Sequence, residues 1–178
     1  MKSQKQSNSY LKDLLNSDIS SDTSLELLLS DKKLNDEDLQ SLSSILEKCN
    51  NLLSLNLELS YNNIGKSGVL NLVQGLEKCI QLLSLELWVE CKVDDQDSQN
   101  MYSFLAKYTN LQTIKLYLES NKMDAWESVS ILGSGLYKCI RLYTLKLYFF
   151  YGLTKSQKDK LIAKIYKMKR LVKKQFYL

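Results

Sequence analysis

The stretch Leu46-Glu-Lys-Cys49-Asn-Asn-Leu52-Leu-Ser-Leu55-Asn-Leu57-Glu-Leu59 recurs along the chain with apolar residues at the same places. It returns at Leu76–Val89, Leu105–Leu118 and Leu136–Phe149, and in degenerate form at Ile165–Leu178. The steps between copies are 30, 29, 31 and 29 residues. Because self-similarity at one fixed period is typical of repeat architectures, five copies in register predict a repeat protein.

Each copy changes its hydrophobic period halfway. In one copy, Leu55, Leu57 and Leu59 alternate as in a strand, whereas Leu72 and Leu76 stand four residues apart as in a helix. An earlier, worn copy around residues 25–29 raises the expected number of strands to six, and a further helix is expected near residues 10–15.

One strand and one helix cannot bury their own apolar face, so neighbouring repeats must stack. The sequence therefore predicts an α/β solenoid, with a curved parallel β-sheet on the concave face and helices on the convex face.

The residues that follow two of the strands resemble a known family. Leu57-x-Leu59-x-x-Asn62-x-Ile64 and Leu116-x-Leu118-x-x-Asn121-x-Met123 match the pattern LxLxxNxL of leucine-rich repeats. The period and the full helix are similar to the ribonuclease-inhibitor-like subclass. The resemblance implies a leucine-rich-repeat domain over residues 21–178, with about five repeats and a sixth strand, after a tail and partial capping helix at 1–20. It also implies the binding of other proteins.

Composition excludes several enzyme classes. The chain has 178 residues and no histidine, which rules out a Ser-His-Asp triad and an HExxH zinc helix. The phosphate-loop-like run from Ser60 to Ser67 lies between a strand and a helix, but the same slot in other repeats reads as an ordinary acidic helix start. A nucleotide-dependent enzyme that uses Gly65-Lys66-Ser67 is thus a minor alternative to a non-enzymatic protein without a cofactor.

The cysteines predict neither a metal site nor a disulfide framework. Cys49, Cys79 and Cys139 occupy one column of the repeat, which also holds Tyr108 and Met168. A position that accepts those residues selects for apolar filling, and a free cysteine behaves as a small buried hydrophobe. With no secretory signal or long apolar run in the sequence, these thiols favour a cytoplasmic location.

The net charge of +4 is unevenly distributed. Residues 155–178 contain nine Lys or Arg and one Asp, so the basic charge is concentrated at the C-terminal end. This leaves open an alternative function, in which the basic segment binds RNA or an acidic membrane. The apolar residues of its helix, however, occupy the columns that earlier helices use for the core.

Aromatic residues form a stripe on the predicted concave face. Trp88, Tyr117 and Tyr148 occupy one outward column of successive strands. Tyr and Trp are enriched in binding hot spots, which favours a protein-interaction module with its partner on this face; the alternative is that the rings only stabilise cross-strand pairs. The predicted partner-binding residues are Trp88, Tyr117, Tyr148, Phe150, Glu58, Glu86 and Lys115.

Overall fold

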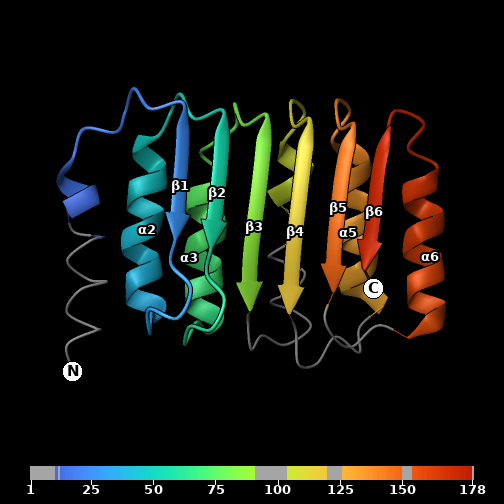
Figure 1. Cartoon of the computed structure of the whole chain (residues 1–178), viewed down its shortest axis with the longest axis horizontal. Helices are drawn as coiled ribbons and strands as arrows, with labels where there is room; N and C mark the ends of the chain where they lie inside the picture. Colours follow the sequence, from blue (N-terminus) through green and yellow to red (C-terminus); the bar gives the residue numbers. More distant parts are fainter. Residues whose placement is uncertain (1–10, 12, 91–103, 120–125, 150–153, 178) are drawn as a thin grey trace.

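The computed structural model describes residues 11, 13–90, 104–119, 126–149 and 154–177. It contains one open sheet of six parallel strands, arranged in the order of the chain (Figure 1). The strands are β1 (Ser24–Leu28), β2 (Ser54–Glu58), β3 (Ser84–Glu90), β4 (Thr113–Glu119), β5 (Thr144–Phe149) and β6 (Lys173–Tyr177). The predicted α/β class and the predicted strands are confirmed, whereas the curvature of the sheet stays a prediction.

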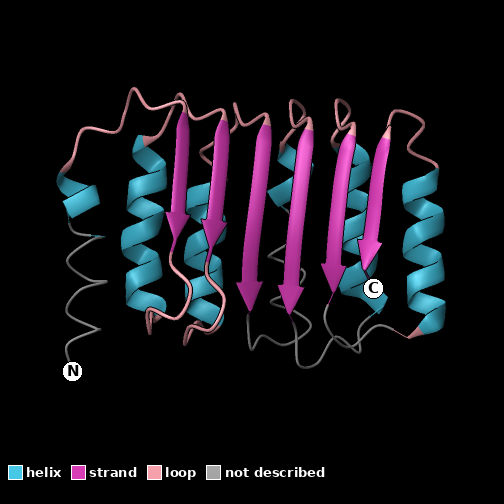
Figure 2. Ribbon diagram, viewed as in Figure 1, coloured by secondary structure: helices cyan, strands magenta, loops and turns pink. Residues whose placement is uncertain are grey.

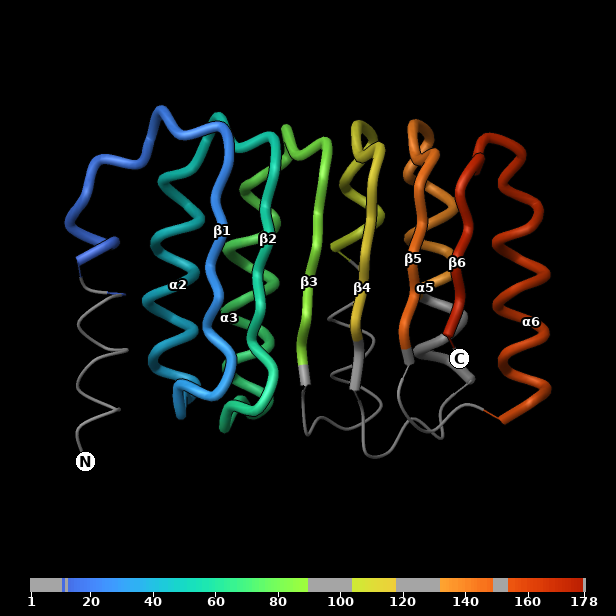
Figure 3. Tube along the Cα trace, in the orientation of Figure 1, coloured from blue at the N-terminus to red at the C-terminus, as the bar shows by residue number. Residues whose placement is uncertain are grey.

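Helices follow the strands on one side of the sheet. They are α2 (Asp36–Lys48), α3 (Lys66–Leu76), α5 (Trp126–Lys138) and α6 (Lys155–Tyr166), with a short 3-10 helix, η1, at Phe104–Lys107. Figure 2 shows the helices behind the strands, with α6 beyond β6, and Figure 3 shows the chain passing from β1 to α2, on to β2, to α3 and to β3. This alternation of parallel strands and helices fits a repeat solenoid.

The register of the sheet places each residue of one repeat beside its counterpart in the next. Leu27 pairs with Leu57, Leu57 with Leu87, Leu87 with Leu116, and so on to Phe176. These leucines are almost completely buried against the helices, as the alternating pattern predicts. Residues at the same position in successive repeats are therefore neighbours on adjacent strands.

The helix termini show why the loops stop where they do. Asn35 and Thr154 begin α2 and α6 with capping boxes, in which the side chain accepts a backbone N–H and the third helical residue returns the bond. At the N-terminal end, residues 11 and 13–16 are helical, and Leu11 is buried in the core. None of the helices in the described part of the chain is long and apolar enough to cross a membrane.

Helices α2 and α3 approach each other closely at Gly75. A Cβ atom at this position would lie 2.8 Å from the Ser43 Cα, a backbone atom that cannot turn away. At Gly133 in α5, by contrast, a Cβ would meet the flexible Lys164 side chain at 2.9 Å. The two glycines thus have different reasons to be small.

We expect Gly75→Ala to destabilise the protein and Gly133→Ala to leave stability unchanged or to raise it. Alanine gains about 1 kcal/mol over glycine in a helix interior, but overpacking against backbone costs about 1–3 kcal/mol. The two effects oppose each other at Gly75, so the net loss there should be up to about 2 kcal/mol. Chemical unfolding of the two variants measures the difference, and equal free energies of unfolding would contradict the close approach of α2 and α3.

Candidate protein-binding face

The side of the sheet opposite the helices is called the open face below. Two columns of side chains form it, because residues between the buried leucines must point away from the core. The aromatic column contains Leu28, Glu58, Trp88, Tyr117, Tyr148 and Tyr177. The polar column contains Glu26, Asn56, Glu86, Lys115, Lys146 and Gln175.

Four rings of the aromatic column stack on one another. The ring centroids of Trp88 and Tyr117 are 3.3 Å apart, those of Tyr117 and Tyr148 4.2 Å, and those of Tyr148 and Tyr177 4.6 Å. The interplanar angles are 7°, 10° and 7°. These four residues are called the aromatic ladder, and the structure brings together its three predicted members.

Tyr177 was missed by the sequence analysis, although the signal was present. It stands 29 residues after Tyr148, at the same place in the degenerate last copy, and it pairs with Tyr148 across β5 and β6. Its side chain is 52% exposed, whereas the other three rings are only partly exposed. The ladder therefore continues over four strands and ends at an exposed ring.

The ladder is a low-polarity environment at the surface. Removal from water, together with a hydrogen bond to Tyr148, raises the pKa of the Tyr117 hydroxyl above its ordinary value. The Trp88 indole N–H donates to Glu86 Oε1 at 3.3 Å, so a residue of the polar column fixes the position of the indole. The rings are thus fixed both by stacking and by hydrogen bonds.

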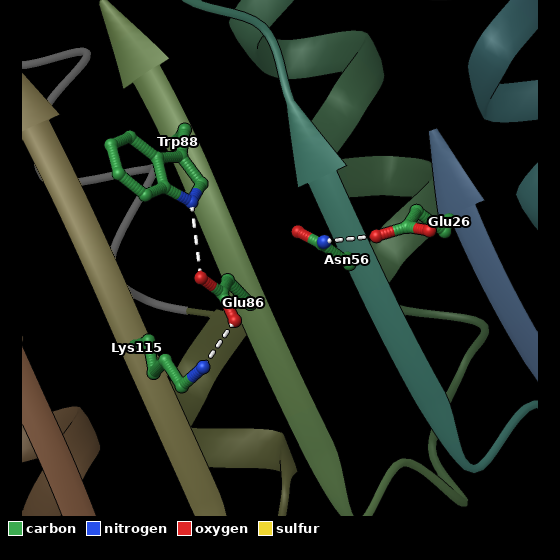
Figure 4. Close-up of polar contacts among 5 residues, drawn as sticks. All are labelled: Glu26, Asn56, Glu86, Trp88 and Lys115. Atoms are coloured by element: carbon green, nitrogen blue, oxygen red, sulfur yellow. Dashed lines mark hydrogen bonds and ion pairs between the residues drawn. The ribbon is translucent and has the colours of Figure 1, made fainter. Parts of the chain in front are cut away.

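The polar column changes charge along the sheet. Glu26 and Glu86 lie on its first three strands, and Lys115 and Lys146 lie on the next two. Lys115 Nζ and Glu86 Oε2 form an ion pair at 2.6 Å where the two halves meet (Figure 4). The sign of the charge therefore marks a direction on the open face.

The remaining predicted residues are placed as follows. Glu58 lies beside Trp88 in the aromatic column, as predicted. Phe150 lies outside the described residues, so its predicted role is not tested by the structure. Leu28, at the first strand of the same column, is 57% exposed and adds apolar surface at that end.

The cysteine column does more than fill space. Two of its side chains donate to carbonyl groups at the end of the helix of the preceding repeat: Cys79 Sγ to Leu46 O at 3.6 Å and Cys139 Sγ to Leu105 O at 3.3 Å. Tyr108 donates in the same way to Leu76 O. The pattern of the column predicted apolar filling alone, which was incomplete, because a hydrophobicity pattern does not show the polar end of a buried side chain.

These thiols are buried and unreactive in character. Desolvation raises the pKa of the Cys79 thiol to about 12 and that of the Cys139 thiol to about 12. Cys49, Cys79 and Cys139 are free of disulfides. In the part of the chain that the structure describes, no group of three or more His, Cys, Asp or Glu side chains is arranged to hold a metal ion.

We expect the free energy of unfolding to fall as the pH rises above about 9. Below that pH, the thiols are neutral in both states, so their contribution to stability is complete. The pKa of the Cys79 thiol is 9.0 in its ordinary state and about 12 in the folded protein. Between these two pH values the thiol ionises in the unfolded chain but not in the folded one, which favours unfolding. Chemical unfolding at pH 7 and pH 10 measures the effect, and Cys79→Ala should reduce the pH dependence; an unchanged dependence in that variant would contradict it.

One backbone N–H group of the phosphate-loop-like run is bonded to another part of the chain. Gly65 is the N-cap of α3, and its N–H donates to Asp36 Oδ1 at 2.7 Å. A carboxylate of the chain itself therefore occupies the place where such a loop would bind phosphate.

The basic C-terminal helix α6 gives its apolar residues to the core. Leu161 and Ile165 are buried, and so is Met168 in the turn that follows. Among its basic residues, Lys164 donates to Ser134 Oγ at 2.6 Å. Helix α6 ends at Tyr166, and residues 167–172 lead the chain back into β6. An amphipathic helix that binds a membrane needs an exposed apolar face, and α6 has used this face for packing.

The fold and the open face define a class: a strand–helix repeat protein with a single parallel sheet. No family model matches the sequence, and no curated protein compared with it matches either. A solved structure, described as Leiomodin-1 Actin-Binding Site 2, is similar to the chain with a TM-score of 0.60. The similarity covers 92% of this chain and 91% of that one at 13% sequence identity, a level at which it shows the fold alone.

Proposed function

We propose that the chain is a non-enzymatic leucine-rich-repeat protein of the ribonuclease-inhibitor-like subclass that binds a protein partner on its open face. The aromatic ladder carries the proposal. Four stacked rings exceed what two neighbouring strands need for cross-strand stabilisation. Tyr and Trp at the centre of a surface are also the side chains most enriched in binding hot spots.

Rigidity supports this function. Each ring of the ladder is held on a paired strand against at least one stacked ring, so it has little rotamer freedom to lose when a partner binds. The polar column beside it supplies a negative half and a positive half. Such a pattern fixes the orientation of a partner more than its affinity. The partner should therefore carry the complementary charges around an apolar centre.

Three observations support a binding protein in a reducing compartment over an enzyme. The described cysteines are free, the loop at Gly65 is occupied by Asp36, and no histidine is present. Cytoplasmic location remains part of the proposal on the same grounds. The similar structure is named for actin binding, which supports a protein as the class of partner and leaves the partner's identity open.

The proposal is tested by affinity capture from the native cell with the wild-type chain as bait. The partner captured by the wild type should be lost with Trp88→Ala/Tyr148→Ala. A matched control is Lys138→Glu at the end of α5, on the side of the helices, which should capture the partner normally. Far-ultraviolet circular dichroism of each bait checks that the fold is kept. Normal capture by the double variant, with loss in the control, would place the partner on the helices and reject the proposal.

A further inference from the structure

A corner of the open face between β2 and β3 has acceptor groups without matching donors. Four side chains surround it: Asn56 and Glu58 on β2, and Glu86 and Trp88 on β3. Asn56 pairs with Glu86 and Glu58 with Trp88 in the parallel register. Neighbouring strands are about 4.8 Å apart and residues i and i+2 about 6.6 Å apart, so the four side chains are close neighbours on the open face.

Asn56 shows the imbalance most clearly. Its Nδ2 donates to Glu26 Oε1 at 2.8 Å, while its Oδ1 is shielded from water and has no donor (Figure 4). Turning the amide around brings no relief, because Asn56 lies between Glu26 on one strand and Glu86 on the other. In either orientation, the amide oxygen faces the side of a carboxylate. An unpaired buried acceptor costs about 1–3 kcal/mol, so the polar groups of this corner are not balanced within the chain.

The Glu58 carboxylate has no hydrogen bond or ion pair within the described part of the chain. Glu86, in contrast, is already engaged by Lys115 and by the Trp88 indole. The charge of Glu58 is therefore available to a partner. It lies next to the ring of Trp88, on the side where β2 runs.

One face of the Trp88 ring is covered and the other is directed toward this corner. The covered face stacks on Tyr117, which lies on β4, so the opposite face is turned to β2 and Glu58. At the other end of the ladder, the ring of Tyr177 is not next to a carboxylate column. The corner thus combines a flat aromatic surface, a carboxylate and an unsatisfied amide oxygen.

Resting on the proposed function, we propose that the corner of Asn56, Glu58, Glu86 and Trp88 receives an arginine side chain of the partner protein. The guanidinium lies on the free face of Trp88 and donates to Glu58. A guanidinium is planar, stacks on aromatic rings and carries five N–H donors in a fork that matches a carboxylate. The ammonium group of a lysine would also neutralise the carboxylate, but it is not planar and cannot stack on the ring or form the paired hydrogen bonds. The rows of the sheet supply the rest of the interface, with the ladder as its apolar centre.

The test uses three short peptides as probes: acetyl-Gly-X-Gly-amide, in which X is arginine, lysine or citrulline. Citrulline has the shape of arginine without its charge. Binding is followed by nuclear magnetic resonance through the indole N–H signal of Trp88, with the signal of Trp126, the second of the two tryptophans, as the internal reference. The arginine peptide should shift the Trp88 signal with a dissociation constant in the millimolar range. The lysine peptide should bind about 2- to 5-fold more weakly, and the citrulline peptide should not bind.

Variants separate the corner from the rest of the face. Glu58→Gln keeps the shape and removes the charge, so it should weaken the arginine peptide at least about 5-fold. Glu37→Gln, an acidic residue of α2 on the side of the helices, is the control and should change nothing. Equal shifts with arginine and citrulline, equal binding of arginine and lysine, or equal effects of the two variants would each overturn the inference.

The same variants distinguish this inference from the proposed function. Suppose that the natural partner no longer binds to Trp88→Ala/Tyr148→Ala but still binds to Glu58→Gln at full strength. The open face is then the interface, and the inferred arginine contact at the corner is wrong. If the arginine peptide binds as expected but the natural partner is unaffected by the ladder variant, the corner is real and the proposed function is wrong.

Discussion

Asn62→Ala is expected to lose about 4 kcal/mol of stability. The Asn62 amide is a bridge between two loops. Its Oδ1 accepts the N–H groups of Lys32 at 3.1 Å and Leu34 at 2.9 Å, and its Nδ2 donates to the carbonyls of Leu29 at 2.8 Å and Leu59 at 2.9 Å. Alanine leaves these backbone groups without the partner, and each unsatisfied buried group costs about 1–3 kcal/mol. Partial hydration of the loops keeps the sum near the lower end.

The loop before α2 depends on this bridge for its conformation. Asp31 and Lys33 have φ angles of 53° and 57°. These lie in the left-handed region, which residues other than glycine adopt at a cost of about 1 kcal/mol or more. The hydrogen bonds of the Asn62 side chain hold Lys32 and Leu34, the residues that follow Asp31 and Lys33 in the chain. Loss of the bridge should therefore release the loop as well as destabilise the fold.

Asn63→Ala is the matched control. Asn63 is exposed, and its backbone N–H donates to Leu34 O, a bond that alanine retains. Urea unfolding of both variants, together with hydrogen exchange at Lys32 and Leu34, measures the difference. Faster exchange and a lower midpoint are expected for Asn62→Ala alone. If the two variants unfold alike, the bridge adds no stability.

The arrangement of the sheet was predictable from the sequence because it depends on period alone. Residues at equal places in successive repeats become neighbours on parallel strands, so the stacking of Trp88, Tyr117 and Tyr148 followed from their spacing. The place of Asn62 in the loop after β2 followed from the LxLxxNxL pattern. Burial of the leucines followed from alternation. Each of these depends only on which residues the fold places side by side.

Other features depend on side-chain geometry, which a period does not contain. The hydrogen bonds of Cys79 and Tyr108 to helix ends require a polar tip on a buried side chain, and an apolar column hides that tip. The unsatisfied oxygen of Asn56 depends on how its amide packs between Glu26 and Glu86, although these neighbours were visible in the sequence. Tyr177 was missed for a different reason: the last copy is degenerate, and its core position is taken by Lys174.

That exception has a physical explanation. Lys174 occupies the place where earlier strands carry Leu145 or Ile114, at the edge strand of the described sheet. Its side chain is only partly buried, and its Nζ lies 4.6 Å from the centroid of the Tyr166 ring on α6. The long side chain thus covers the core with its methylene groups while its charge contacts an aromatic face. A hydrophobic pattern cannot identify a lysine as the counterpart of these apolar residues, but the pairing of Leu145 with Lys174 does.

Tyr117→Ala should weaken binding of the natural partner at least about 10-fold, since a true hot-spot aromatic contributes about 2 kcal/mol or more. Tyr117 lies between Trp88 at 3.3 Å and Tyr148 at 4.2 Å, so its removal divides the ladder and frees the rings on both sides. The loss therefore includes both its own contact and the fixed orientation of its neighbours. Tyr177→Ala removes an end ring, with one neighbour at 4.6 Å, and should cost less, about 3-fold.

Tyr117→Phe separates stacking from hydrogen bonding at the same position. Phenylalanine keeps the ring between its neighbours and removes the hydroxyl that bonds with Tyr148. Binding should stay within about 3-fold of the wild type if the stacked ring is what the partner contacts. Calorimetric titration with the captured partner gives the affinities, and thermal unfolding gives the stability of each variant. If Tyr117→Ala binds normally and loses stability instead, the ladder braces the sheet and the partner lies elsewhere.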